Sequence, residues 1–155
     1  MRFLLKVFSY LIVLVIGFIG GVYALPILTA PPSPTEQQVS ALFGVSKYSA
    51  EFRRELPGSD FLHWGDGKVT LSAQSIAFMG LLAPGPDYKL YLVPEYVDTA
   101  DAFMRRKSQS VQVGEIKTFN NFIVPLDPAI DLEQFTTLVV WCETFEKFIS
   151  AAQYR

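Results

Sequence analysis

An apolar run near the N-terminus, residues 7–28, places the strongest constraint on how this chain can fold. It is 22 residues long, and Ser9 is its only plainly polar member. At about 1.5 Å rise per residue, a helix of this length reaches roughly 33 Å, enough to cross a hydrocarbon core of about 30 Å. We therefore expect residues 7–28 to contact the lipid bilayer and the remainder of the chain to fold separately.

Basic residues flank this run on one side only. Arg2 and Lys6 precede it, and the next basic residue is Lys47. By the positive-inside rule, this bias leaves the N-terminus cytoplasmic and makes the protein a single-pass cell-membrane protein with an extracytoplasmic C-terminal domain. The alternative is a signal peptide cleaved at Val22-Tyr23-Ala24, which would give a secreted or periplasmic protein. The length of the run favours the uncleaved anchor.

Composition divides the chain into three parts. Residues 1–28 form the membrane anchor or signal peptide, residues 29–35 a proline-rich linker, and residues 36–155 the folded domain. This domain contains eleven Lys and Arg and fifteen Asp and Glu, which give it a net charge of −4. This acidic balance argues against nucleic acid as a partner, which would require a basic patch. A single cysteine permits no internal disulfide.

Short segments of alternating hydrophobicity, bounded by Gly and Pro turns, dominate the domain. Thr35 and Gln38 fit a capping box, so we expect a short helix that ends near Gly44. Residues 49–56 are expected to add one or two helical turns. Residues 99–107 fit either a helix capped by Thr99 or a surface loop, and residues 145–152 fit a closing helix or strand. Strands are expected at residues 68–73, 76–78, 88–93, 110–118, 122–124 and 136–143.

The segment at residues 136–143 has the strongest strand pattern in the chain. Its inner run is apolar on both faces, which is typical of a central strand. Leu138, Val140 and Cys142 share one face, and Val139 and Trp141 share the other. The spacing of the strands predicts a mainly β fold: a small antiparallel β-sandwich or barrel with short peripheral helices, preceded by one N-terminal transmembrane helix.

Several short motifs follow one another between residues 61 and 152. They are His63-x-x-x-Gly67; Pro84-Gly85-Pro86-Asp87 leading into Leu90-Tyr91-Leu92; Gly114-Glu115-Ile116-Lys117; Asn120-Asn121-Phe122-Ile123-Val124-Pro125; and Val139-Val140-Trp141-Cys142 with Phe145, Phe148 and Ala151-Ala152. In this order and spacing they resemble the DM13 domain. Phe122 departs from the family pattern, in which a tyrosine is common at that position.

The resemblance implies an extracytoplasmic, mostly β domain whose signature residue is the cysteine matched by Cys142. The family is often called an electron-transfer domain, which implies redox activity through a bare thiol or a bound group such as haem. Cys142 is therefore the candidate catalytic residue, and His63 and Cys142 are the candidate cofactor-binding residues. They are the only histidine and the only cysteine, and both residue types can ligate haem iron.

Other chemistries lack the residues they need. No CxxCH motif is present for covalent haem attachment, and no G-x-S-x-G elbow for a hydrolase. One His and one Cys fall short of the three or four ligands of a zinc site, so no metal site is expected. Both candidates also have simpler interpretations, because a free cysteine often packs as a small hydrophobic residue and His63 fits a turn beside Trp64.

Two hypotheses for the function follow. In the first, the protein is a membrane-anchored redox or haem-binding module centred on Cys142, and its partner is a redox protein. In the second, it is a non-catalytic envelope module that binds a partner protein or a small apolar ligand, and Cys142 belongs to the core. The position of Cys142 separates them: an accessible cleft near His63 favours chemistry, and a site sealed beneath Leu138 and Val140 favours packing.

Overall fold

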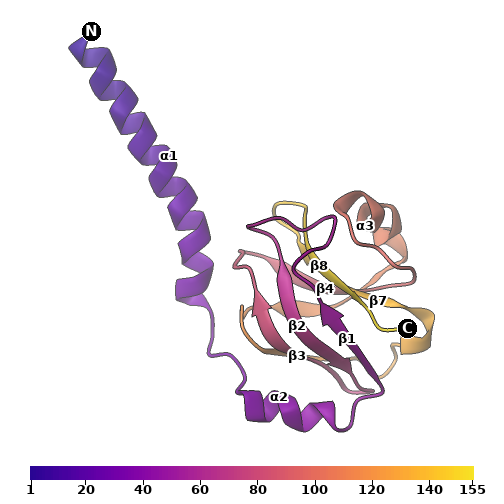
Figure 1. Ribbon diagram of the computed structural model, residues 1–155. Helices are drawn as coiled ribbons and strands as arrows, with labels where there is room; N and C mark the ends of the chain where they lie inside the picture. The colour runs from indigo at the N-terminus through magenta and orange to yellow at the C-terminus, as the bar shows by residue number, and fades with distance from the viewer.

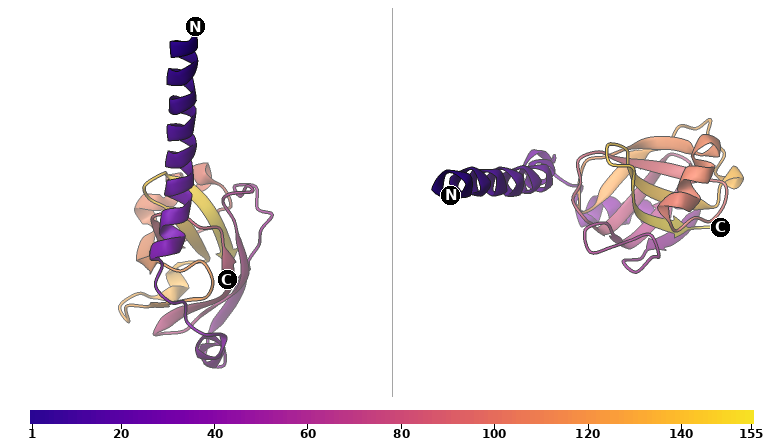
Figure 2. Two further views of the ribbon diagram at one scale, coloured as in Figure 1. Left: turned by 90° about the vertical axis from the view of Figure 1, so that its left-hand side faces the viewer. Right: turned by 90° about the horizontal axis from the view of Figure 1, so that it is seen from above.

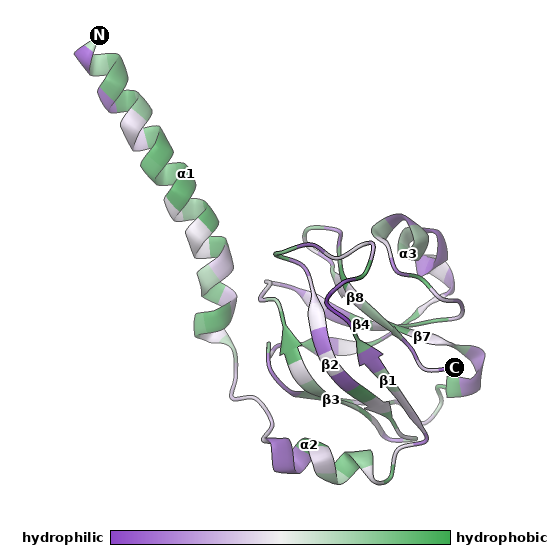
Figure 3. Cartoon of the chain, viewed as in Figure 1, coloured by the Kyte–Doolittle hydropathy of each residue, from purple (hydrophilic) through white to green (hydrophobic).

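The computed structural model describes residues 1–155 as one long helix beside a β-sandwich (Figure 1). Helix α1, Arg2–Thr29, contains no buried residue, and its surface is hydrophobic over most of its length (Figure 3). It is the one helix long and apolar enough to cross a membrane, a property that an N-terminal signal sequence shares. The predicted helix is therefore present, and its orientation in a bilayer stays a prediction.

A second helix, α2 (Glu36–Phe43), follows the proline-rich segment. Its predicted capping box is confirmed: the Gln38 backbone N–H donates to Thr35 Oγ1 at 3.3 Å, and the Thr35 N–H donates to the Gln38 side chain at 2.8 Å. Val39 is its buried residue, and the helix ends at Gly44 as expected. The cap fixes where regular structure resumes after the prolines, because it satisfies backbone donors that the first turn leaves unpaired.

Eight strands form two four-stranded sheets, and all neighbouring strands are antiparallel (Figure 2). The first sheet has the order β1-β2-β3-β6 and the second the order β5-β4-β7-β8. The bounds are β1 Tyr48–Phe52, β2 Gly65–Leu71, β3 Ser75–Leu82, β4 Tyr88–Val93, β5 Val111–Ile116, β6 Phe122–Pro125, β7 Thr137–Cys142 and β8 Lys147–Gln153. The prediction of a mainly β, sandwich-like fold with short helices is confirmed.

The main core lies between the two sheets and contains 22 buried residues. Val69 and Phe78 enter it from the first sheet, and Leu90 and Val140 enter it from the second. None of these four side chains is exposed to solvent. β7 lies between β4 and β8 and is buried at all six of its positions, which confirms the prediction of a central strand.

A smaller cluster of eight buried residues covers the outer face of the second sheet. Helix α3 (Ala100–Arg106) supplies Phe103 to it, and β7 supplies Val139 and Trp141. The Thr99 side chain accepts a hydrogen bond from the Ala102 N–H at 3.2 Å, so the helical alternative for residues 99–107 is the right one. The remaining helical segments are two 3₁₀ turns, η1 Lys107–Gln109 and η2 Leu132–Gln134.

The prediction of helical turns at residues 49–56 is wrong, because β1 occupies the first half of that segment and no helix follows in the second half. β1 pairs with β2 along its whole length, from Tyr48 opposite Leu71 to Phe52 opposite Gly67. Ala50 and Phe52 alternate into the main core, which is the period of a strand. So short a segment has little helical stability of its own, and pairing with β2 decides its conformation. At the other end of the chain, β8 shows that residues 147–153 form a strand.

Candidate functional site

Cys142 lies at the end of β7, where the main core meets a surface pocket. In the strand register it stands opposite Tyr88 of β4 and Lys147 of β8. Its side chain is only 2 % exposed and belongs to the main core. Trp141, one residue earlier, belongs to the cluster on the other face of the sheet, as the alternation in the sequence predicts. The position of Cys142 therefore depends on two neighbouring strands and not on a flexible loop.

The thiol of Cys142 is held in its neutral form. Burial raises the pKa of the Cys142 thiol, and backbone hydrogen bonds with Phe145 and Asp87 only partly offset this effect. Burial acts in this direction because a thiolate loses more hydration than a thiol does. Since the thiolate is the nucleophile and the metal ligand, reaction at Cys142 requires a group that takes the proton.

Tyr88 forms a wall of the site next to Cys142. Its hydroxyl donates to the carbonyl of Ala83 at 2.8 Å, and its ring contacts Phe119 edge-on at a centroid distance of 6.0 Å. Gly85 makes room for this ring, since a Cβ there would lie 2.4 Å from it. Burial and the nearby Cys142 raise the pKa of Tyr88, so its hydroxyl also stays neutral.

His63 lies in the loop between β1 and β2 and is held by Asp60. The His63 Nδ1 lies 2.8 Å from one Asp60 oxygen and 2.9 Å from the other. Asp60 also accepts the backbone N–H groups of Leu62 and His63, at 2.8 and 2.9 Å. Burial opposes ionisation of Asp60, but these hydrogen bonds outweigh it and lower the pKa of the carboxyl. The contact with Asp60 engages Nδ1, so Nε2 is the nitrogen left for other chemistry.

His63 and Cys142 line the same pocket, although 79 positions separate them in the sequence. The pocket has a volume of about 160 Å³, and eight of its thirteen lining residues are hydrophobic. Tyr88 and Phe145 contribute from the sandwich, and Tyr23 is one of three contributors from α1. The site thus combines the two expected positions of Cys142. Cys142 is buried in the core, as a structural cysteine would be, and it also lines a pocket that contains His63, as a reactive one would.

The pocket is too small for haem. A volume of about 160 Å³ lies below the lower end, about 300 Å³, of ordinary small-molecule sites. The ligand chemistry is also unfavourable, because the raised pKa of Cys142 disfavours the thiolate that would bind iron. The pocket instead suits a molecule smaller than the usual ligands of such sites, or part of a larger apolar one. No three His, Cys, Asp or Glu side chains are arranged to hold a metal ion.

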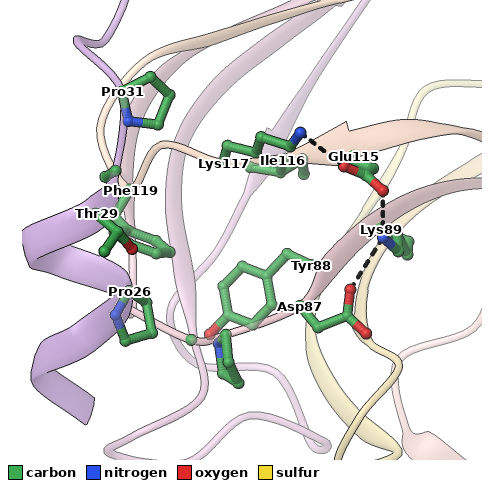
Figure 4. A pocket seen from close by; sticks show the side chains of 13 residues that line it. Pro26, Thr29, Pro31, Asp87, Tyr88, Lys89, Glu115, Ile116, Lys117 and Phe119 are labelled. Carbon is green, nitrogen blue, oxygen red and sulfur yellow. Dashed lines mark hydrogen bonds and ion pairs between the residues drawn. The ribbon is translucent and has the colours of Figure 1, made fainter. Parts of the chain in front are cut away.

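A second hollow, of about 220 Å³, lies beside the first and has four charged side chains on one wall: Asp87, Lys89, Glu115 and Lys117 (Figure 4). The Lys89 Nζ lies 2.9 Å from a carboxylate oxygen of Asp87 and 2.7 Å from one of Glu115, and the Lys117 Nζ lies 3.0 Å from the other oxygen of Glu115. Hydrogen bonds from Lys89 and Lys117 lower the pKa of Glu115 to about 2. These charges compensate one another, so the hollow contains no acid or base suited to proton transfer near neutral pH.

Sequence reasoning identified His63 and Cys142 but missed the groups that complete their pocket. Phe145 belongs to a quoted motif and Tyr88 begins the strand predicted at residues 88–93, yet neither was assigned to the site. The strand register was the missing information, because it places Tyr88 directly opposite Cys142. Asp60 stands three residues before His63, a spacing at which an Asp side chain can bind local backbone N–H groups, and that signal could have been used.

Comparison with known proteins gives one positive result. The family described as Electron transfer DM13 matches residues 56–154. Comparison with curated proteins gives no match, and comparison with solved structures gives none either. The matched region runs from the loop that carries His63 to the end of the sandwich and contains Cys142. The chain belongs to the DM13 family of electron-transfer domains.

Proposed function

We propose that the protein is a membrane-anchored redox module in which the thiol of Cys142 is the group that changes oxidation state. The observation that supports this proposal is the pocket that contains both the only cysteine and the only histidine of the chain. The family description, electron transfer, supports the redox class. Helix α1, whose apolar run follows Arg2 and Lys6, supports anchoring with the domain on the extracytoplasmic side.

The proposed oxidation uses a peroxide as the oxidant. The sulfur of Cys142 attacks one peroxide oxygen, an S–O bond forms while the O–O bond breaks, and the second oxygen leaves as water or an alcohol after taking a proton. The product is a sulfenic acid. A small thiol then attacks the sulfenic acid, which releases water and forms a mixed disulfide with Cys142. A second small thiol attacks the small-thiol sulfur of this disulfide, so that Cys142 leaves as a thiol and the two small thiols become a disulfide.

His63 is assigned the role of proton acceptor. Cys142 is neutral at pH 7, because burial raises its pKa, and the attacking species is the thiolate. His63 lines the same pocket, and its contact with Asp60 leaves Nε2 as the basic nitrogen. His63→Gln is expected to slow oxidation at pH 7 by about 100-fold. At alkaline pH, where the thiolate forms without a base, its rate should converge with that of the wild-type protein; a uniform loss at every pH would contradict this role.

The thiol itself can be tested by mass spectrometry on the full chain in detergent. Peroxide followed by a nucleophilic trap for sulfenic acid should add one trap mass at Cys142 in the folded protein. Because the chain has one cysteine, the mass of the intact protein reports on this residue alone. Cys142→Ser is the control and should gain no mass. Modification that appears only after denaturation would overturn the redox proposal.

A second candidate function has its own support. Cys142 is 2 % exposed and belongs to the 22-residue core, and burial raises its pKa. These features suit a structural cysteine in a non-catalytic module that binds an envelope partner protein or a small apolar ligand in the pocket. In that case Cys142→Ser lowers stability but leaves ligand or partner capture unchanged.

A further inference from the structure

The β-sandwich exposes aromatic side chains at the tips of two loops. Phe61, between β1 and β2, is 85 % exposed, and Phe145, between β7 and β8, is 52 % exposed. Both loops lie at the upper end of the sandwich in Figure 1, and α2 lies at the opposite, lower end. Large apolar side chains gathered at one end of a domain mark a surface that contacts another apolar phase.

The contact between α1 and the sandwich gives the depth of these loops relative to a bilayer. Ile19 and Tyr23 of α1 line the same pocket as Leu62 and Phe145. The apolar run ends at Leu28, so at about 1.5 Å per residue Ile19 and Tyr23 lie roughly 7–13 Å inside it. One leaflet contributes about 15 Å to the hydrocarbon core. If α1 crosses the bilayer, the loops that contact it at this level lie within the leaflet.

The loop that carries Phe61 is built in a way that tolerates an apolar environment. Asp60 accepts the backbone N–H groups of Leu62 and His63, and the Asp60 N–H donates to the His63 carbonyl at 3.0 Å. The Asp60 carboxylate is itself paired with the His63 ring. These contacts satisfy the backbone N–H groups of Asp60, Leu62 and His63, which favours an apolar environment, while the Phe61 and Leu62 side chains stay exposed.

We propose that this end of the sandwich, with Phe61, Leu62 and Phe145 at its tips, inserts into the bilayer leaflet on the domain's side. The proposal rests on the anchoring by α1 proposed above and adds a second membrane contact to it. Interfacial segments of this kind bury apolar side chains about 5–10 Å deep, and aromatic rings are favoured there. As a consequence, the pocket of Cys142 and His63 faces the lipid side of the domain, and molecules dissolved in the bilayer can reach it.

Site-specific fluorescence on the full chain in phosphatidylcholine vesicles tests this proposal. In a Cys142→Ser background, one cysteine is introduced by Phe61→Cys, Phe145→Cys or Val45→Cys and labelled with an environment-sensitive dye. Val45 is the matched control, because it is apolar and 71 % exposed but lies just after α2, at the far end of the domain. Circular dichroism and thermal melting check that each variant folds.

The expected result is quenching by lipids with nitroxide-labelled chains, and protection from aqueous iodide, at positions 61 and 145. Position 45 should show the reverse. If the vesicles carry the protein but positions 61 and 145 behave as position 45 does, insertion is overturned, anchoring by α1 stands, and exposed Phe61 is left for a partner protein. If the protein does not float with the vesicles at all, both anchoring and insertion are overturned.

Discussion

The two faces of β7 differ in chemistry although both are buried. The inner face carries Leu138, Val140 and Cys142 into the core between the sheets, and its last residue reaches the pocket. The outer face carries Val139 and Trp141 into the cluster beneath α3. The inner face thus ends at a neutral thiol, and the outer face ends at a large aromatic ring.

Polar groups distinguish the two faces further. On the outer side, Glu143 lies 2.6 Å from Lys107 and accepts a hydrogen bond from the Tyr91 hydroxyl, and Lys107 lies 5.5 Å from the centre of the Trp141 ring. The Trp141 N–H itself has no acceptor. The outer face is therefore packed against α3 and bordered by the charged pair Glu143 and Lys107, which we call its charged rim. The inner face leads to the candidate site. Four predictions test this division.

The largest effect is expected from the outer face. Trp141→Ala should lower the free energy of unfolding by about 3–5 kcal/mol, because it removes a fully buried ring that packs on Phe103. Urea unfolding of the full chain in detergent, followed by circular dichroism, measures this loss. Trp141→Phe keeps a ring and removes the unsatisfied N–H, so its loss should be clearly smaller. A change within about 0.5 kcal/mol for Trp141→Ala would show that α3 does not depend on this face.

Cys142→Ser is expected to have the next largest effect, a loss of about 1–3 kcal/mol, because a hydroxyl would replace a thiol at a buried position. Cys142→Ala is the matched variant, since it removes the polar group together with the sulfur, and it should lose less. The same unfolding measurement applies. If the serine variant is as stable as the alanine variant, the floor of the pocket is hydrated, and the contrast between an apolar inner face and a charged outer rim is contradicted.

Lys107→Met should lower stability by about 1 kcal/mol at neutral pH, because it leaves the Glu143 carboxylate without its ammonium partner. Burial opposes ionisation of Glu143, but Lys107 and Tyr91 outweigh it and lower the pKa of the carboxyl. The pair therefore stabilises the fold above the ordinary carboxyl pKa, and this contribution disappears as pH falls through the lowered value. Thermal melting from pH 7 to pH 3 should show a weaker acid dependence for Lys107→Met; an unchanged dependence would contradict the pairing.

The smallest effect concerns the thiol at alkaline pH. Burial raises the pKa of Cys142 in the folded state, so the unfolded chain loses this proton first as pH rises. Stability from the neutral thiol is complete below the unfolded pKa of about 8.5 and decreases as pH rises from there through the folded pKa. Melting of wild-type protein and of Cys142→Ala between pH 7 and pH 9.5 should reveal a slightly steeper loss for the wild type. Parallel curves would indicate an exposed thiol.

Local sequence patterns were sufficient for β4 and β7 of the second sheet, whereas for β8 they left a helix or a strand open. The strand predicted at residues 88–93 coincides with β4, and the alternation in residues 138–142 assigns each side chain of β7 to the correct face. These segments are apolar, bounded by turns and long enough for a period of two to be recognised. The first sheet was harder, because residues 48–52 alternate over only five positions, and Phe52 and Leu56 also have the spacing of a helix.

The candidate site could be predicted only in part. The rarity of Cys142 and His63 identified them as candidates, but their shared pocket depends on a β1–β2 loop folding over the end of β7. Asp60 fixes that loop, and Tyr88 reaches the pocket through the pairing of β4 with β7. Contacts between residues so distant in sequence leave no local periodicity, so no pattern in either segment reveals them.

The sequence by itself determined the long apolar helix, the central strand with its two faces, and the family motifs that include Cys142. Each is a local property, fixed by hydrophobic periodicity, by turn residues or by the order of short motifs. Only the tertiary structure decided that β1 is a strand, that Cys142 and His63 share one pocket, and that α1 helps to line it. Those outcomes come from strand pairing and burial, which act between residues that the chain brings together only when it folds.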